Sequence, residues 1–143
     1  MAKYSVTYSC GHTETRQLYG KETQRQSYIA WAGSAGRCAA CAAQDKESGI
    51  EAAEAEHDLP SLTGSEKQIA WARSIRSNLI TDLMAFLAPM QAKAEQIDQM
   101  ADFERRVALV LQTVCAQTTA RYWIDNKDMS VRVLIATAQK AAA

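Results

Sequence analysis

Four potential metal ligands, placed in two tight pairs near the N-terminus, constrain this chain more than any other feature. Cys10 and His12 flank Gly11, and Cys38 and Cys41 are separated by two alanines. Structural zinc sites are closed by thiolates and imidazoles, commonly with two ligands from each of two turns. An N-terminal module this small has few core residues, and metal binding supplies folding free energy directly. We therefore predict that these four residues hold one structural zinc ion.

The residues around the two pairs predict a β-hairpin followed by a short helix. Residues 3–9 alternate between apolar and polar side chains and residues 13–19 form a second strand-like run, so the first pair lies in a hairpin turn. Residues 24–32 carry apolar side chains at helical spacing, and Gly33 and Gly36 favour an end to that helix. The second pair follows at once, which gives a zinc-ribbon-like arrangement.

The middle of the chain predicts a solvated segment and then a long amphipathic helix. Residues 42–58 are polar and acidic, and Pro60 favours an end to any helix there. Thr63 and Glu66 have the spacing of a capping box, and apolar residues follow at spacings of three and four. Pro89 is expected to kink or end this long helix near the preceding residue.

The remainder of the chain is also expected to be helical. Residues 92–100 continue the helical pattern, a second apolar stripe runs from Phe103 to Thr118 and ends near Trp123, and residues 129–139 form a last helix. The fold class is therefore mainly α, with an N-terminal zinc-ribbon-like β-hairpin and knuckle followed by a helical hairpin or small bundle. The expected divisions are a zinc-ribbon-like module over 1–43, an acidic helical connector over 44–58 and a helical body over 59–143.

The charge of the chain is balanced overall but unevenly distributed. There are 16 basic and 16 acidic residues. Residues 1–43 contain five basic and two acidic residues, a net charge of +3, whereas residues 44–58 contain one basic and six acidic residues, a net charge of −5. A free nucleic-acid-binding domain is usually more basic than this chain. The composition therefore disfavours a strong polyelectrolyte role.

The sequence predicts a cytoplasmic protein with no membrane segment. The N-terminus lacks the apolar core of a signal peptide, and the apolar runs are short and interrupted by charged or polar residues. Three of the four cysteines belong to the metal pattern, which suits a reducing compartment better than a disulfide framework does. The fourth, Cys115, lies in a helical apolar pattern and is expected to be a small core residue.

An enzymatic interpretation of the metal motif is the least favoured alternative. His12 and Glu14, followed by the second cysteine pair, resemble the H-x-E … P-C-x-x-C signature of zinc deaminases, in which the glutamate is the acid-base group. Cys10, however, offers a fourth ligand in place of the catalytic water, and Arg37 stands where the signature has proline. We therefore expect no catalytic residues and a structural ion.

Three stretches resemble a family of small zinc-ribbon proteins found in bacterial phages and other mobile elements. They are residues 4–12, 18–21 and 38–41 (YSVTYSCGH, LYGK and CAAC), residues 59–76 (LPSLTGSEKQIAWARSIR) and residues 121–125 (RYWID). The family usually has proline inside the second knuckle, where this chain has Ala39. The resemblance implies zinc and a mobile-element setting, without an established biochemical activity. Inhibition of host defence, as in anti-CRISPR or anti-restriction proteins, is an extension by association.

Basic residues in two regions are the candidate partner-binding residues. Around the hairpin they are Arg16, Lys21 and Arg25, and on the first long helix they are Lys67, Arg73 and Arg76. The simpler alternative for the helix is a solvated face with Trp71 half-buried. We expect a non-enzymatic binding protein whose partner is a protein complex of the host or phage. A nucleic-acid-binding accessory role is the alternative, and formation of a homodimer stays open.

Overall fold

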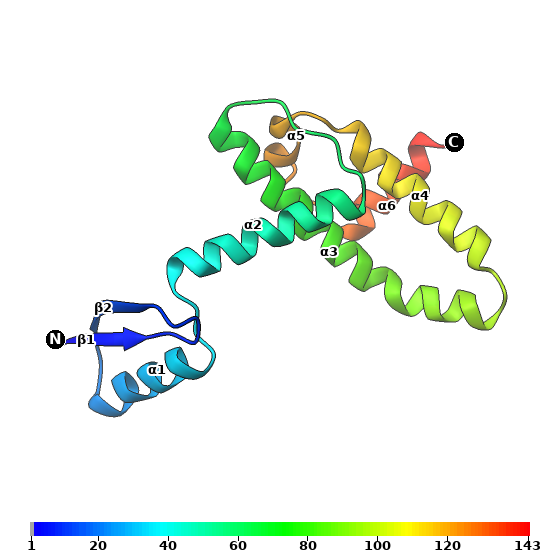
Figure 1. Ribbon diagram of the computed structural model, residues 1–143. Helices are drawn as coiled ribbons and strands as arrows, with labels where there is room; N and C mark the ends of the chain where they lie inside the picture. The colour runs from blue at the N-terminus through cyan, green and yellow to red at the C-terminus, as the bar shows by residue number, and fades with distance from the viewer. Residues whose placement is uncertain (1) are drawn as a thin grey trace. The chain divides into compact units, whose positions relative to one another are not determined.

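A two-stranded antiparallel sheet and six helices make up residues 2–143, the part of the chain that the computed structural model describes (Figure 1). The elements are β1 (Ala2–Thr7), β2 (Thr13–Leu18), α1 (Glu22–Ser34), α2 (Ala39–Glu56), α3 (Glu66–Gln96), α4 (Met100–Ala116), α5 (Ala120–Asp125) and α6 (Val131–Ala141). The expectation of a mainly α protein with an N-terminal hairpin is confirmed. The chain groups into two compact units, Met1–Gly49 and Ile50–Ala143.

The first unit is built on the predicted hairpin. Its register pairs Ala2 with Leu18 at the open end and Thr7 with Thr13 beside the turn. Alternation along β1 directs Val6 inward, where α1 packs against the strand and leaves Val6 completely buried. The buried cluster of this unit consists of Val6, Tyr8, Ala32 and Cys38. A core this small supports the expectation that the unit needs a further source of stability.

Helix α2 begins earlier than the sequence pattern indicated. The backbone N–H of Ala42 donates to the carbonyl oxygen of Cys38 at 2.9 Å, so the first helical turn starts inside the second ligand pair. The helix then continues through the acidic segment to Glu56. Residues 44–56 are therefore part of this longer helix, and Ile50 is its buried hydrophobic residue.

Helix α3 has a different N-terminal cap from the one that the sequence predicted. The side chain of Ser65 accepts a hydrogen bond from the backbone N–H of Gln68 at 3.3 Å, and the backbone N–H of Ser65 donates to Gln68 Oε1 at 3.1 Å. The prediction of a box from Thr63 to Glu66 is wrong because the backbone of Thr63 pairs elsewhere. Its N–H donates to the carbonyl oxygen of Thr118 at 2.8 Å, and its carbonyl accepts from Ala120.

Pro89 does not end α3, which continues to Gln96. Figure 1 shows the yellow-green C-terminal part of the helix bent away from the green part. Proline removes one backbone hydrogen bond, but Leu87 and Ala94 on either side are buried and keep both parts packed. The helix ends where Asp98 adopts a positive φ of 55°. Although α3 is long, no helix within residues 2–143 combines the length and apolarity needed to cross a membrane.

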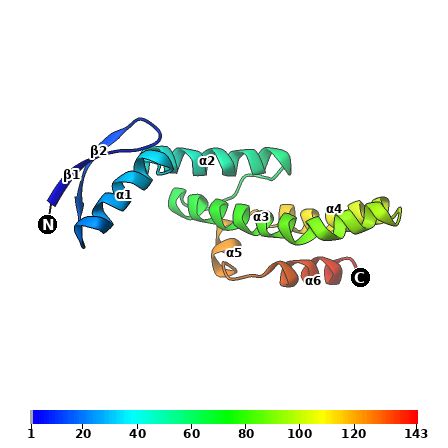
Figure 2. The same cartoon turned by 90° about the horizontal axis from the view of Figure 1, so that it is seen from below.

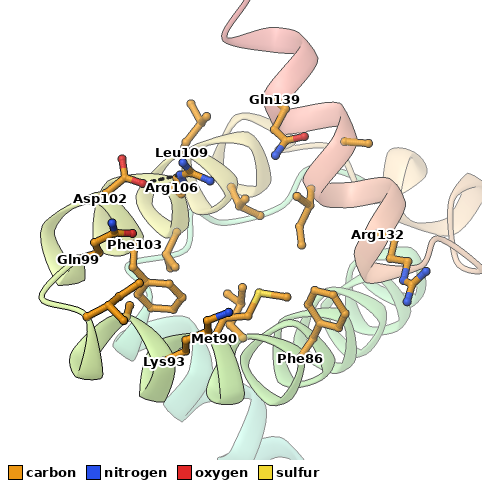
Figure 3. Close-up of a pocket in the computed structure, with 17 residues that line it drawn as sticks. Phe86, Met90, Lys93, Gln99, Asp102, Phe103, Arg106, Leu109, Arg132 and Gln139 are labelled. Carbon is orange, nitrogen blue, oxygen red and sulfur yellow. Dashed lines mark ion pairs between the residues drawn. The ribbon is translucent and has the colours of Figure 1, made fainter.

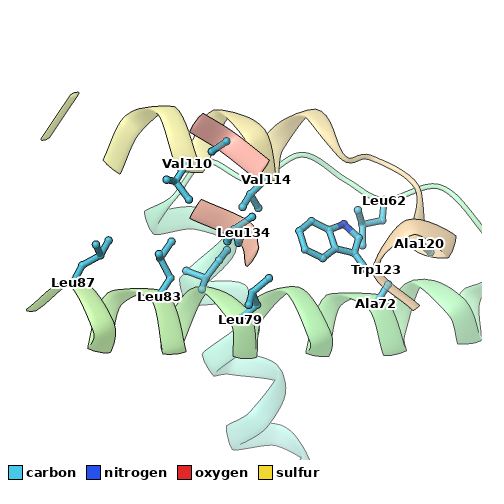
Figure 4. Close-up of a cluster of buried hydrophobic side chains, with 12 residues drawn as sticks. Leu62, Ala72, Leu79, Leu83, Leu87, Val110, Val114, Ala120, Trp123 and Leu134 are labelled. Carbon is cyan, nitrogen blue, oxygen red and sulfur yellow. The ribbon is translucent and has the colours of Figure 1, made fainter. Parts of the chain in front are cut away.

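The second unit has its core between the α3–α4 hairpin and the two short helices that follow. Figure 2 shows α5 and α6 on one face of the hairpin, and α3 packs against α4, α5 and α6. Trp123 lies at one end of this core, only 1% exposed, and its Nε1 donates to the carbonyl oxygen of Gln117 at 3.0 Å (Figure 4). Leu79, Leu83, Val114 and Leu134 pack in the same cluster. Trp123, near which the second apolar stripe was predicted to end, is therefore a core residue.

Candidate metal centre

The fold brings the two predicted ligand pairs to one point. The Sγ atoms of Cys10, Cys38 and Cys41 and a ring nitrogen of His12 all lie within 4.8 Å of one another. The Nδ1 atom of His12 is 3.3 Å from Cys41 Sγ and 3.6 Å from Cys38 Sγ. Tetrahedral zinc with bonds of about 2.3 Å to sulfur and about 2.0 Å to nitrogen places such atoms roughly 3.5 Å apart. The four residues therefore fit a zinc ion, with His12 binding through Nδ1.

The hairpin turn positions the first ligand pair. The backbone N–H of Tyr8 donates to the carbonyl oxygen of His12 at 2.9 Å, and the N–H of Gly11 donates to the carbonyl oxygen of Tyr8 at 2.9 Å. Gly11 adopts a φ of +82°, which a residue with a side chain adopts only at a cost. This tight turn carries Cys10 and His12 on either side of the glycine.

The N-terminus of α2 positions the second pair. The backbone N–H of Cys41 points at Cys38 Sγ, with an N–S distance of 3.4 Å. Peptide N–H groups at the start of a helix favour negative charge, so this position suits a thiolate ligand. Just before the pair, the Arg37 guanidinium makes two 2.8 Å hydrogen bonds to the carboxylate of Asp45. This ion pair therefore connects the residue just before Cys38 to the second turn of α2.

Backbone contacts join the two ligand-bearing turns. The N–H of Ser9 donates to the carbonyl oxygens of Ala32 and Gly36 at 2.9 and 3.0 Å, and the Ser9 hydroxyl donates to the Gly36 carbonyl at 2.7 Å. Gly36 itself packs tightly, because a Cβ atom there would lie 2.7 Å from the Cα of Ala32. The turn that carries Cys10 is thus seated on the end of α1, directly before Cys38.

The cysteine thiols differ in their acidity. Backbone hydrogen bonds from Cys38 and then from His12 lower the pKa of Cys10 to about 6. A side-chain hydrogen bond with Cys38, together with burial, raises the pKa of Cys41 to about 11. Metal-bound cysteines are thiolates, so binding of zinc expels the remaining thiol protons. Zinc affinity is expected to increase with pH for this reason.

The donor set favours structure over catalysis. Three sulfurs and one nitrogen complete a four-coordinate zinc shell and leave no position for a water molecule. Glu14, the acid-base group that the deaminase-like pattern requires, lies in β2 and accepts a hydrogen bond from Arg16 Nε at 3.4 Å. This arrangement supports a structural ion.

The basic residues of the hairpin region are engaged within their own unit. Arg16 pairs with Glu14, and its guanidinium carbon lies 5.9 Å from the centre of the Tyr8 ring. Arg25 pairs with Glu22 at 2.7 Å and lies over the Tyr4 ring at 5.8 Å. Lys21 precedes α1 and is exposed. Of the three residues proposed around the hairpin, only Lys21 thus presents its charge without an ion-pair partner in the part that the structure describes.

The proposed partner-binding set on α3 needs correction. Arg76 is 1% exposed, and it bonds Glu54 Oε1 and the carbonyl oxygen of Pro60, each at 2.8 Å. Arg73 makes two hydrogen bonds to the same carboxylate, at 2.9 and 2.8 Å. A partner-binding role is wrong for Arg76, because burial removes its charge from the surface, and Arg73 is held in the same internal network. Lys67 is exposed as expected.

Exposed aromatic residues of the first unit were not singled out by sequence reasoning. Trp31 on α1 is 52% exposed, and its ring lies 5.6 Å from the ring of Tyr28. Tyr19, just after β2, is 68% exposed. Tyr28 and Trp31 lie at helical spacing, which by itself predicts that both belong to one apolar face. Only the packing of α1 against β1 shows that Trp31 lies outside the core.

Comparison of the chain with protein-family models, with curated protein sequences and with solved structures finds no match.

Proposed function

We propose that this chain is a non-enzymatic, zinc-stabilised binding protein whose first unit recognises another protein. The observation that carries the proposal is the exposed Trp31, which stands beside Tyr28 on α1. Tryptophan and tyrosine are strongly enriched among the residues that dominate protein–protein binding energy. The backbone of α1 is joined to the metal-binding turn through Ser9, so zinc fixes the surface on which Trp31 stands.

The charges of the same unit favour a protein partner over nucleic acid. Nucleic-acid binding draws its affinity from cations that are free to neutralise phosphates. Arg16, Arg25 and Arg37 each have a carboxylate partner inside the unit. Arg25 is also largely covered, with its side chain 18% exposed. A nucleic-acid-binding accessory role stays the second candidate, since aromatic side chains also stack on bases and residues 1–43 have an excess of three positive charges.

The biological setting of the proposal rests on the resemblance to zinc-ribbon proteins of phages and mobile elements. In that setting the partner is a host or phage protein complex in the cytoplasm. Inhibition of a host defence system is the form of binding that such a setting suggests. The metal in this proposal is zinc, held by Cys10, His12, Cys38 and Cys41.

A capture experiment with paired tryptophan variants tests the protein-binding proposal. The zinc-loaded chain is immobilised and exposed to nuclease-treated lysate of a bacterial host, beside Trp31→Ala and Trp71→Ala. Trp71 is a matched control because it is 51% exposed but lies on α3 in the other unit. We expect the unsubstituted chain to bind a protein partner saturably. The affinity of that partner should fall at least tenfold for Trp31→Ala and stay unchanged for Trp71→Ala.

Two results would contradict the proposal. If the partner binds Trp31→Ala and Trp71→Ala with equal affinity, Trp31 does not contribute to the interface. A partner that disappears on nuclease treatment, together with a steeply salt-dependent gel shift weakened by changes at Arg16, Lys21 and Arg25, supports nucleic-acid binding instead.

X-ray absorption of the zinc-loaded chain tests the structural role of the metal, because a bound water in place of one sulfur reopens the enzymatic alternative.

A further inference from the structure

A cavity of about 530 Å³ lies within the second unit, between α3, α4 and α6. Figure 3 shows Phe86 and Met90 on the α3 side, Leu109 on the α4 side and Gln139 on the α6 side of one hollow. The volume falls within the range of about 300–1,000 Å³ that is typical of small-molecule sites. The three helices therefore border a hollow that is partly open to solvent and that their own side chains do not fill.

Apolar side chains at helical spacing make up most of the wall. Phe86 and Met90 come from one stripe of α3, Ile97 directly follows that helix, and Phe103 and Val107 come from one stripe of α4. Met90 is 45% and Ile97 is 52% exposed, so large apolar groups remain in contact with water when the cavity is empty. Covering these side chains with an apolar ligand is favourable because it removes their surface from water.

Positive charge is in excess at the edge of the cavity. Lys93, Arg106 and Arg132 line it together with one carboxylate, that of Asp102. Asp102 accepts from Arg106 Nε at 2.8 Å, the ion pair drawn in Figure 3, and it also pairs with Arg105 outside the cavity. Lys93 and Arg132 make no ion pair within residues 2–143. An apolar wall with two cations of unmet charge favours a ligand that has an apolar body and an anionic end.

We infer that this cavity binds a single-chain anionic amphiphile, such as a medium-chain fatty carboxylate. The chain lies along Phe86, Met90 and Phe103. Lys93 and Arg132, which lie at separate points around the hollow in Figure 3, attract the carboxylate through their positive charge. A partner helix fits less well: an α-helix of roughly 10 Å diameter and 1.5 Å rise fills roughly 120 Å³ per residue, so the cavity admits only one to two turns. The proposed site is independent of the zinc site and of Trp31.

Calorimetric titration of the zinc-loaded full chain with dodecanoate, below its micellar concentration, tests this inference. We expect one saturable site per chain. Dodecyltrimethylammonium has the same tail with an opposite head charge, and we expect it to bind at least tenfold more weakly. The double variant Lys93→Gln/Arg132→Gln is expected to weaken dodecanoate binding about fivefold, because it removes two exposed positive charges from the site. The control Lys127→Gln removes a positive charge outside the cavity and should leave binding unchanged.

A second variant tests the cavity itself. Ala136 lines the cavity from α6 and is exposed, so Ala136→Phe fills the space without entering the core. We expect at least a tenfold loss of dodecanoate binding with an unchanged circular dichroism spectrum. Absence of saturable binding to the unsubstituted chain, equal binding of both amphiphiles, or retained binding in Ala136→Phe would each overturn the inference. Sedimentation showing a dimer that Ala136→Phe dissociates also overturns it, since a second copy then occupies the cavity.

Discussion

The hydroxyl of Ser9 donates a 2.7 Å hydrogen bond to the carbonyl oxygen of Gly36. Ser9 directly precedes Cys10, and Gly36 lies two residues before Cys38. The bond therefore joins the two turns that carry the candidate metal ligands, although it involves none of those four residues. Contacts of this kind, outside the coordinating atoms, orient metal ligands and tune affinity.

Replacement of Ser9 by alanine is expected to weaken zinc binding without removing a ligand. Loss of the hydroxyl leaves the Ser9 backbone bonds intact, so the cost is about 1 kcal/mol, or roughly fivefold in zinc affinity. Competition with a zinc indicator measures the change. Ser34→Ala is the control, because the Ser34 hydroxyl donates within the end of α1, to the carbonyl of Trp31. Equal affinities in the two variants would show that the link does not organise the site.

Loss of one ligand is expected to unfold the first unit while the helices of the second remain. Cys41→Ser replaces a thiolate by a weak ligand, and the four buried side chains of the first unit cannot compensate for the lost metal. Native mass spectrometry should show one zinc per unsubstituted chain and none in the variant, with most far-UV helicity retained. Cys115→Ser is the matched control, since Cys115 lies on α4 outside the site. A metal-free chain with an intact, protease-resistant first unit would refute the structural role.

Arg76→Ala is expected to lower the free energy of unfolding of the second unit by about 2–4 kcal/mol. The substitution removes one of the two arginines that bond Glu54 and removes the donor to the carbonyl of Pro60. Urea unfolding followed by circular dichroism measures the loss. Lys67→Ala removes an exposed cation from the same helix and should change stability by less than about 0.5 kcal/mol. Similar effects of the two substitutions would contradict the buried network.

The same network predicts a pH dependence. Hydrogen bonds from Arg73, and next from Arg76, lower the pKa of the Glu54 carboxyl below its ordinary value of 4.5. A carboxylate with a lowered pKa stabilises the fold fully above its ordinary pKa, and this contribution is lost as pH falls through the lowered value. The difference in unfolding free energy between the unsubstituted chain and Glu54→Gln should therefore be constant near neutral pH and shrink below about pH 4.5. A difference that stays constant down to pH 3 would exclude this coupling.

The N-terminal cap of α3 is tested by a pair of neighbouring substitutions. Ser65→Ala removes the acceptor for the N–H of Gln68 and is expected to cost about 1 kcal/mol of stability. Thr63→Ala removes only a 3.3 Å hydroxyl contact to the carbonyl of Thr118 and should cost less. Thermal unfolding of the two variants provides the comparison. A larger loss in Thr63→Ala would favour the cap that spacing alone suggested.

Local spacing sufficed to predict the candidate metal ligands and most helices and strands. The motif Cys10-Gly11-His12 forms a turn because glycine accepts a positive φ, and the second pair opens a helix, so both pairs follow from residues adjacent in sequence. Periodicity likewise predicted the two strands and the long helix from 66 onward, because the alternation of apolar residues directly reflects which face is buried. Local spacing could not decide between a capping box from Thr63 to Glu66 and one from Ser65 to Gln68, because both pairs have suitable residues.

Long-range packing decided the remaining features. Whether Arg76 is a surface cation depends on Glu54 and Pro60, which lie 22 and 16 residues away in the chain. The exposure of Trp31 depends on which face of α1 packs against β1. The cavity between α3, α4 and α6 depends on how the three helices pack together, which the sequence of each helix does not specify. The sequence by itself thus determined the four candidate metal ligands and the helical character of this protein. The tertiary structure alone decided which charges and aromatic rings face water, because burial is a property of contacts between distant segments.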